Sequence, residues 1–146
     1  MILVVAAAIL DRTGRVLIAQ RPAGKHMAGR WEFPGGKVAP GESEEAALAR
    51  ELAEELGIEV TGARAMMRLQ HRYPDRSVEL SMWVVESYRG EPQALDGQRL
   101  KWVQRAQLER EDILEADRAF VAALVQWPSH SQNPDRIRHG SEERSS

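Results

Sequence analysis

The segment RELAEELG, residues 50–57, places Glu51, Glu54 and Glu55 at spacings of three and four residues. In an α-helix this spacing brings all three carboxylates onto one face, within about one turn. Arg50 is the nearest basic residue, whereas an exposed acidic face usually interleaves lysines at i+4. Carboxylates clustered in this way suit a hard divalent cation, Mg²⁺ or Mn²⁺, which offsets their repulsion. A solvated acidic helix face is the alternative interpretation.

The residues around this segment predict a helix with both ends marked. Ser43 can cap its start, Glu44 and Glu45 complement the positive helix start, and Gly57 suits a left-handed residue after the last turn. The residues between are strong helix formers. A separate apolar stripe at four-residue spacing would dock the helix: Leu48, Leu52 and Leu56.

Length and composition limit the class of protein. The chain has 146 residues, a formal net charge of −2 and no cysteine. This length fits one domain with its own core, and the charge does not suggest binding to a nucleic acid polymer. The lack of cysteine excludes disulfides and thiolate sites and fits a reducing cytosol. The apolar start, MILVVAAAIL, is too short to span a bilayer, which favours a buried strand. We expect a cytoplasmic protein that acts as a monomer and has no membrane contact.

The first part of the chain reads as strands and loop. Residues 1–10 and 15–21 are apolar runs that flank the turn sequence DRTG, which predicts an antiparallel hairpin. Residues 21–42 are rich in proline and glycine, so we expect a loop with one short strand near 31–33.

The part after the predicted helix contains more strands and a second helix. Strands are expected over 62–73 and 77–90, a strand and turn over 100–108, and a helix over 112–127. This order favours a mixed α/β sandwich over a parallel βαβ array. We expect one domain over residues 1–127, followed by a flexible polar tail over 128–146.

Nine positions between residues 36 and 58 follow the pattern G-x5-E-x7-R-E-U-x-E-E-x-G-U, in which U is a bulky aliphatic residue. They are Gly36, Glu42, Arg50, Glu51, Leu52, Glu54, Glu55, Gly57 and Ile58. The pattern resembles the Nudix box without a departure, and so many fixed positions make the signal specific. The resemblance implies the Nudix α/β/α sandwich, in which a mixed sheet lies between the catalytic helix and the C-terminal helix.

The resemblance extends beyond the box. The stretches RPAGKHMAGRWEFPGGK, YPDRSVEL and GEPQALDGQ look like those of the bacterial MutT proteins, which remove 8-oxo-dGTP from the nucleotide pool. The similarity covers roughly residues 2–126. It implies metal-dependent hydrolysis of a nucleoside triphosphate to a monophosphate and pyrophosphate, with 8-oxo-dGTP as the favoured substrate. A non-catalytic Nudix binding module is a further alternative, which the complete set of box glutamates disfavours.

The resemblance also implies the metal ligands. Glu51, Glu54, Glu55 and the Gly35 carbonyl would hold Mg²⁺, with Mn²⁺ as a substitute. A bound metal acidifies water, and in MutT-type enzymes that water attacks the β-phosphorus. Asp96 stands where a MutT protein has a glutamate that reaches the metals, so its side chain is one methylene shorter. A plain turn residue in the sequence LDGQ is the alternative.

Within the box, the resemblance implies different roles for the acidic residues and the arginine. Glu51 is the first candidate for the general base or for a metal ligand beside it. Arg50 is expected to orient the glutamates rather than contact the substrate, because charge-assisted hydrogen bonds would fix their geometry. Glu42 would support this arrangement.

Nucleotide contacts are implied outside the box. Arg21 and His26 match positions that contact phosphate and sugar, and Arg76 is a candidate for a phosphate or base contact; ordinary exposed loop residues are the alternative. The residues expected beside the nucleoside are Glu32, Phe33, Pro34 and Gly35. Three aromatic residues are candidates for stacking, with core packing as the alternative: Trp31, Tyr73 and Trp83.

Asp117 departs from the resembled pattern, in which this position is often Asn. An ionised carboxylate only accepts hydrogen bonds, so it would accept from N7–H of 8-oxoguanine and repel the bare N7 of guanine. The base O6 would then lack a donor unless Asp117 is protonated or another residue supplies one. A carboxylate also accepts well from the cytosine amino group, which makes CTP, dCTP or 5-methyl-dCTP the alternative substrate. An exposed helix acid is the simplest interpretation.

Overall fold

The computed structural model describes residues 1–24 and 27–127, so His26 and the predicted tail at 128–146 lie outside the described residues. The elements in this part are β1 (Ile2–Ile9), β2 (Val16–Gln20), β3 (Trp31–Glu32), β4 (Gly35–Lys37), α1 (Glu44–Leu56), β5 (Glu59–Tyr73), β6 (Arg76–Arg89), β7 (Arg99–Val103) and α2 (Arg118–Gln126). Two short 3-10 helices, Arg105–Arg110 and Glu115–Asp117, precede α2.

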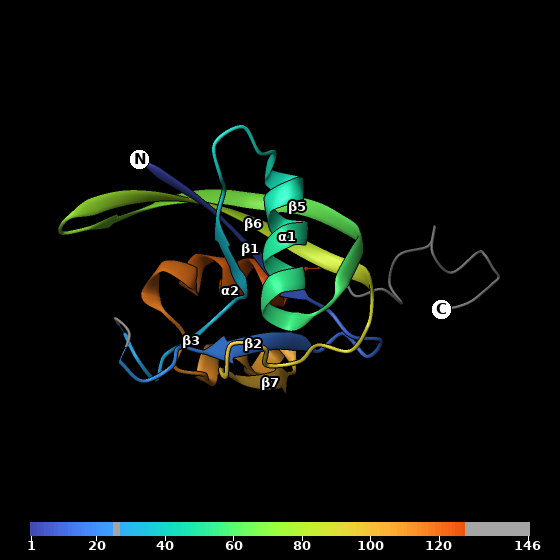
Figure 1. Cartoon of the computed structure of the whole chain (residues 1–146). Coiled ribbons are helices and arrows are strands. Elements are labelled where there is room, and N and C mark those ends of the chain that lie inside the picture. The colour runs from blue at the N-terminus through green and yellow to red at the C-terminus, as the bar shows by residue number, and fades with distance from the viewer. Residues whose placement is uncertain (25–26, 128–146) are drawn as a thin grey trace.

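The strands form two sheets (Figure 1). The larger sheet has the order β4-β1-β6-β5; β1 runs parallel to β6 and antiparallel to β4, so this sheet is mixed. The smaller sheet has the order β3-β2-β7 and is antiparallel. Figure 1 shows α1 crossing the β5–β6 ribbon in this view, with one end of the helix toward β2. The predicted mixed α/β architecture is confirmed, and the smaller sheet adds a feature that the sequence did not predict.

The strand β1 is covered on both faces, which explains its unbroken apolar sequence. Val5, Ala7 and Ile9 pack in the core beneath α1, whereas Ala6 and Ala8 pack in the core on the side of α2. Alternate side chains of one strand therefore serve two cores, and each helix closes one of them.

The predicted hairpin of the first two apolar runs is wrong. Its turn forms, since the Asp11 N–H donates to the Arg15 carbonyl over 3.0 Å, but only one isolated bridge, Leu10 to Val16, joins the runs. The two edges of β1 are already paired with β4 and β6, so β2 continues into the other sheet. Turn chemistry predicted the reversal correctly but could not predict which neighbours each strand acquires.

The helix α1 begins and ends as predicted. The Ser43 side chain accepts a hydrogen bond from the Ala46 N–H over 3.1 Å, and Gly57 adopts the left-handed conformation at φ 72°. The predicted stripe is buried, with exposed fractions of at most 1% for Leu48, Leu52 and Leu56. This docking turns the opposite face of α1, with the box glutamates, away from the core.

The second helix is shorter than the predicted range 112–127. A 3-10 turn occupies Glu115–Asp117, and regular helix runs only from Arg118 to Gln126. Its buried residues Phe120, Val121 and Leu124 close the second core. Within residues 1–24 and 27–127, no helix is long and apolar enough to cross a membrane.

Candidate active site

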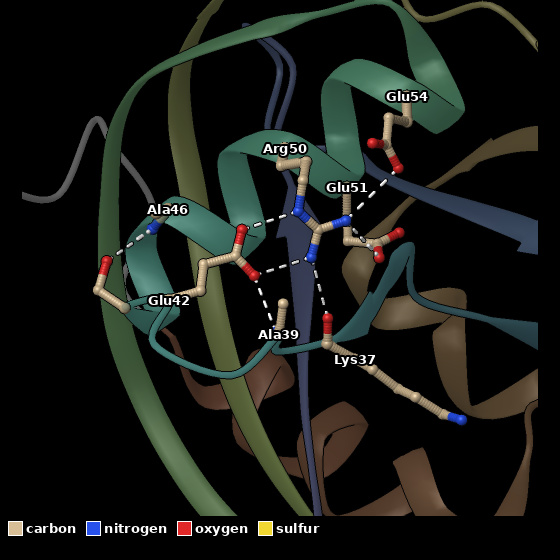
Figure 2. A network of polar contacts seen from close by, with 8 residues as sticks. Lys37, Ala39, Glu42, Ala46, Arg50, Glu51 and Glu54 are labelled. Carbon is tan, nitrogen blue, oxygen red and sulfur yellow. Dashed lines mark hydrogen bonds and ion pairs between the residues drawn. The ribbon is translucent and has the colours of Figure 1, made fainter.

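Arg50 is the centre of a polar network on the exposed face of α1 (Figure 2). Its Nε and Nη2 donate to the two carboxylate oxygens of Glu42 over 2.7 and 2.9 Å, and Nη2 also donates to the Lys37 carbonyl over 3.1 Å. Its Nη1 donates to Glu51 over 3.1 Å and approaches Glu54 at 3.5 Å. One guanidinium therefore joins the loop before α1, the strand β4 and the glutamates of the helix.

This network gives Glu42 a strongly stabilised negative charge. The bonds from Arg50, with a further bond of 2.9 Å from the Ala39 N–H, lower the pKa of Glu42 to about 2. The carboxylates of Glu42 and Glu51 in turn raise the pKa of Arg50. Glu42 and Arg50 thus form a permanent ion pair in which the arginine retains donors for Glu51, as expected for a residue that orients the site.

The two glycines before the box loop are required by close packing. A Cβ on Gly36 would lie 2.3 Å from the Glu51 carboxylate carbon, and a Cβ on Gly35 would lie 2.0 Å from the Val5 carbonyl oxygen. Gly36 therefore leaves the space that the Glu51 carboxylate fills, while Gly35 lets β4 approach β1. The Glu51 side chain is consequently held from two sides, by Arg50 and by the backbone of β4.

Glu55 lies in the opposite electrostatic environment. Burial, a hydrogen bond with Glu51 and the charges of Glu51, Glu32 and Asp96 together raise its pKa to about 9, and burial is the largest cause. Residues of α1, β3 and the loop before β7 thus place negative charge around one carboxyl group. A divalent cation is the species that such a donor set suits, because it would replace the mutual repulsion by attraction.

The geometry of the carboxylates nevertheless differs from that of a finished metal site. Among the described residues, no three acidic or histidine side chains already converge on one point. The hard oxygen donors fit Mg²⁺ or Mn²⁺ in type and charge, so binding would require the glutamate side chains to rotate.

The loop that carries Asp96 is attached to the end of α1. The Gln93 N–H donates to the Leu56 carbonyl over 2.9 Å, and the Gln98 side chain donates to the Glu55 carbonyl over 3.3 Å. These bonds satisfy carbonyls that the helix end leaves unpaired. Asp96 also has a turn role, because its N–H donates to the Gln98 side chain. Sequence reasoning did not identify Gln98, whose anchoring role depends on a contact far along the chain.

A second polar group surrounds Asp117, the residue that the resemblance places beside the substrate base. Asp117 is 6% exposed and accepts a long hydrogen bond of 3.4 Å from the Phe33 N–H. Burial raises its pKa to about 7, with a further contribution from Glu32, while the Phe33 N–H and Arg21 act in the opposite direction. The interpretation of Asp117 as an exposed helix acid is therefore wrong. Arg21 pairs with Glu32 at 2.9 Å, which joins this group to the carboxylates of α1.

Two predicted contact residues lie at the end of the β5–β6 ribbon. The Arg76 guanidinium lies 5.1 Å from the ring centre of Tyr73 and 3.8 Å from the Asp75 carboxylate. Burial and the charge of Asp117 raise the pKa of Tyr73, so its phenol belongs to the same electrostatic region as the buried aspartate.

The other aromatic candidates divide between core and surface. Phe33 and Phe120 pack edge to face with ring centres 4.8 Å apart, so Phe33 offers its backbone rather than its ring. Trp83 is 8% exposed and donates to the buried Ser81 hydroxyl, which supports its core interpretation. Trp31 is half-buried, with the Lys101 ammonium 4.6 Å from its ring centre. The Pro34 carbonyl accepts from the Ala7 N–H and is occupied within the fold.

Comparison with known proteins agrees with this arrangement. The NUDIX domain family matches residues 5–123. The chain is 47% identical over 128 residues to the "Putative 8-oxo-dGTP diphosphatase 2" of Mycobacterium tuberculosis (strain CDC 1551 / Oshkosh), covering 84% of this chain and 87% of that one. It is 41% identical over 121 residues to the "CTP pyrophosphohydrolase" of Escherichia coli (strain K12), covering 83% and 90%.

A solved structure shares the fold over nearly its whole length. It comes from a study of MutT from Aliivibrio salmonicida and Vibrio cholerae, and it superposes with a TM-score of 0.77 at 35% identity, covering 86% of this chain and 98% of that one. The fold agrees with these similarities, and the chain belongs to the NUDIX domain family.

Proposed function

We propose that the protein hydrolyses 8-oxo-dGTP to 8-oxo-dGMP and pyrophosphate, in the presence of a divalent metal, and so removes an oxidised nucleotide from the pool. The observation that carries this proposal is the shared hydrogen bond of Glu51 and Glu55, surrounded by the charges of Glu32 and Asp96. Carboxylates held this close are costly unless a cation joins them. The likeness to proteins named as 8-oxo-dGTP diphosphatases supports the choice of substrate.

Mg²⁺, with Mn²⁺ as a substitute, would be held by Glu51, Glu54, Glu55, Asp96 and the Gly35 carbonyl. When bound, such an ion neutralises phosphate charge and makes a coordinated water more acidic. Asp96 is the shortest of these acids, and its place beside Glu55 depends on the anchored loop from Gln93 to Gln98.

The residues of the chain then have distinct tasks. Glu51, as general base, would accept a proton from the attacking water at a carboxylate oxygen. The water oxygen bonds to the β-phosphorus, and the bridging bond to the α-phosphate oxygen breaks, which releases monophosphate and pyrophosphate. Arg50 would hold Glu51 in position without touching the substrate, since its donors are engaged by Glu42, Glu51 and the Lys37 carbonyl.

Base selection would depend on Asp117 and the backbone of Phe33. With its pKa raised to about 7, Asp117 has access to both protonation states near neutral pH. The ionised form accepts from the N7–H of 8-oxoguanine, and the protonated form donates to O6. Arg21, His26 and Arg76 would contact phosphate, sugar or base, and Glu32 and Pro34 would lie beside the nucleoside.

A cytidine nucleotide is the second candidate substrate. An ionised Asp117 accepts from the cytosine amino group, and the E. coli relative at 41% identity is named a CTP pyrophosphohydrolase. The metal, the base and the bond broken would be the same for either nucleotide. We propose that the protein acts as a cytoplasmic monomer.

A substrate panel tests the proposal. Purified protein with Mg²⁺ would receive 8-oxo-dGTP, dGTP, dCTP and 5-methyl-dCTP, and kcat/KM would be measured from released pyrophosphate. A strong preference for 8-oxo-dGTP over dGTP is expected, and Asp117→Asn should reduce this preference because the amide also offers a donor to N7. Preference for the cytosine nucleotides would identify the second candidate, and no turnover of any nucleotide would overturn the assignment.

A further inference from the structure

A cleft of about 470 Å³ lies beside the candidate active site, at the end of the smaller sheet. It is lined by the last residue of β2, by described residues of the loop after β2 on either side of positions 25–26, and by the residues that lead into β7. Its polar side chains are Gln20, Arg21, Gln98 and Arg99. Gln20 and Arg99 are paired neighbours in the β2–β7 ladder, and the Gln20 amide donates to the Gly29 carbonyl over 3.0 Å, so the sheet supports the cleft on two sides.

Two residues that line the cleft are also bonded to residues of the carboxylate site. Arg21 lines the cleft and pairs with Glu32, whose charge acts on Glu55. Gln98 lines it as well and donates to the Glu55 carbonyl. A ligand with one end at the carboxylates of α1 would therefore extend into this space.

The charge of the cleft fits an anion. No described residue that lines it is acidic, while two arginines do so. Arg99 is exposed, and its guanidinium makes no ion pair or hydrogen bond with another residue in the described ranges. An arginine fork is well matched to the paired oxygens of a phosphate chain.

We propose that this cleft binds the β- and γ-phosphates that leave as pyrophosphate, and that Arg99 is a specificity residue that favours triphosphates over diphosphates. The inference rests on the proposed function, since it assigns a second part of the same substrate. Arg21 would hold the phosphates nearest the carboxylates, and Arg99 would bind the terminal phosphate. A diphosphate lacks that terminal group and gains nothing from Arg99.

The test compares Arg99→Gln and Arg99→Lys with the unaltered protein. For Arg99→Gln, kcat/KM for the triphosphate should fall about tenfold, as expected for one lost charge-assisted bond, with little change for the diphosphate of the same base. Arg99→Lys should recover part of the loss, because lysine restores the charge but not the fork. The matched control is Arg12→Gln, an exposed arginine at the other end of β2, which should change neither value.

Direct binding separates this inference from the proposed function. Sodium pyrophosphate would be titrated calorimetrically into metal-free protein, and Arg99→Gln should weaken binding about tenfold relative to Arg12→Gln. If the unaltered protein hydrolyses nucleotides but Arg99→Gln changes neither binding nor the triphosphate preference, the cleft assignment is wrong and the proposed function stands. If no nucleotide is hydrolysed yet pyrophosphate binding depends on Arg99, the proposed function is wrong and the cleft assignment stands.

Discussion

The glutamates at the two ends of α1 have the same chemistry and opposite environments. Before the helix and in its first turn, Glu42 and Glu44 have lowered pKa values, to about 2 for Glu42. Near the helix end, Glu55 has a pKa raised to about 9. Residue type and helix position cannot produce this contrast alone, so the partners that the fold supplies to each carboxylate decide it.

At the start of α1 both Glu42 and Glu44 have donors. Glu42 accepts from Arg50 and from a backbone N–H, while Glu44 accepts from the Ser81 hydroxyl over 2.6 Å and pairs with Arg68. At the end of the helix, burial, the neighbouring acids and the negative pole of the helix dipole all disfavour a charged Glu55. The first end stabilises the fold, and the second stores repulsion that a divalent cation would relieve.

The largest expected effect comes from removing one charge at the repulsive end. Glu51→Gln should lower kcat by about 10²–10⁴-fold, because the amide neither accepts a proton from water nor contributes a full charge to a metal. The folded state without metal should be as stable as before or more stable, since the repulsion with Glu55 is reduced. Pyrophosphate release and thermal unfolding with a chelator would measure the two effects.

The matched control for Glu51→Gln is Glu59→Gln. Glu59 is an exposed acid at the start of β5, paired with Arg89 at 3.6 Å, and its substitution should leave turnover unchanged. Near-normal turnover in a folded Glu51→Gln variant would remove Glu51 from the catalytic assignment.

A smaller effect is expected from removing some of the hydrogen bonds by which Arg50 connects Glu42 with Glu51. Arg50→Lys keeps the positive charge but cannot donate to Glu42, Glu51 and the Lys37 carbonyl together. We expect kcat/KM to fall about 10–100-fold, the size of effect that substitution of an orienting residue beside metal ligands produces. Arg64→Lys, which alters a surface ion pair of β5, should have no such effect. Equal losses in both variants would show that Arg50 supports only the fold.

Substitutions around Glu44, at the start of α1, should change the stability of the protein instead of its activity. Ser81 is 2% exposed, accepts from the Trp83 indole over 3.0 Å and donates to Glu44. Ser81→Ala leaves the indole N–H unpaired and should lower the free energy of unfolding by about 1–3 kcal/mol. Denaturant unfolding would measure this loss, with Ser87→Ala on the same strand as the control, because its hydroxyl bond lies at the surface. A comparable loss of kcat in Ser81→Ala would contradict the separation of the two ends.

The comparison also shows which features were predictable from sequence. The caps of α1 and its apolar stripe depend on residues close in the chain, so their spacing predicted them, whereas the role of Arg50 was implied by the resemblance. The strand β4, Gly35–Lys37, has no strand propensity and forms because β1 pairs with it. The separation of β1 and β2 into two sheets has the same cause, since strand pairing is decided by distant neighbours.

The candidate site divides in the same way. The approach of Glu32 and Asp96 to Glu55 and the burial of Asp117 are contacts between distant segments, which no local pattern encodes. For Asp117 the resemblance identified the position as a base contact, with an exposed helix acid as the alternative, and no local pattern indicated its burial. The 3-10 turn before α2 places it against the Phe33 N–H instead.

The smallest expected effect is a difference in the pH dependence of stability without metal. Glu42 binds its proton less tightly in the folded state, so its stabilisation is present above an ordinary glutamate pKa of about 4.5 and is lost as the pH falls toward 2. Glu55 binds its proton more tightly when folded, so its contribution is present below about 4.5 and is lost as the pH rises toward 9. Unfolding in chelator across this range should show that Glu42→Gln reduces the acid slope, to which Glu44 also contributes, and that Glu55→Gln reduces the alkaline slope, to which Asp117 also contributes. Each variant removes the contribution of at most one proton, so neither variant should alter the other's side. If Glu55→Gln leaves the alkaline slope unchanged, folding does not raise the pKa of Glu55. The unfavourable environment that distinguishes this end of α1 would then be absent.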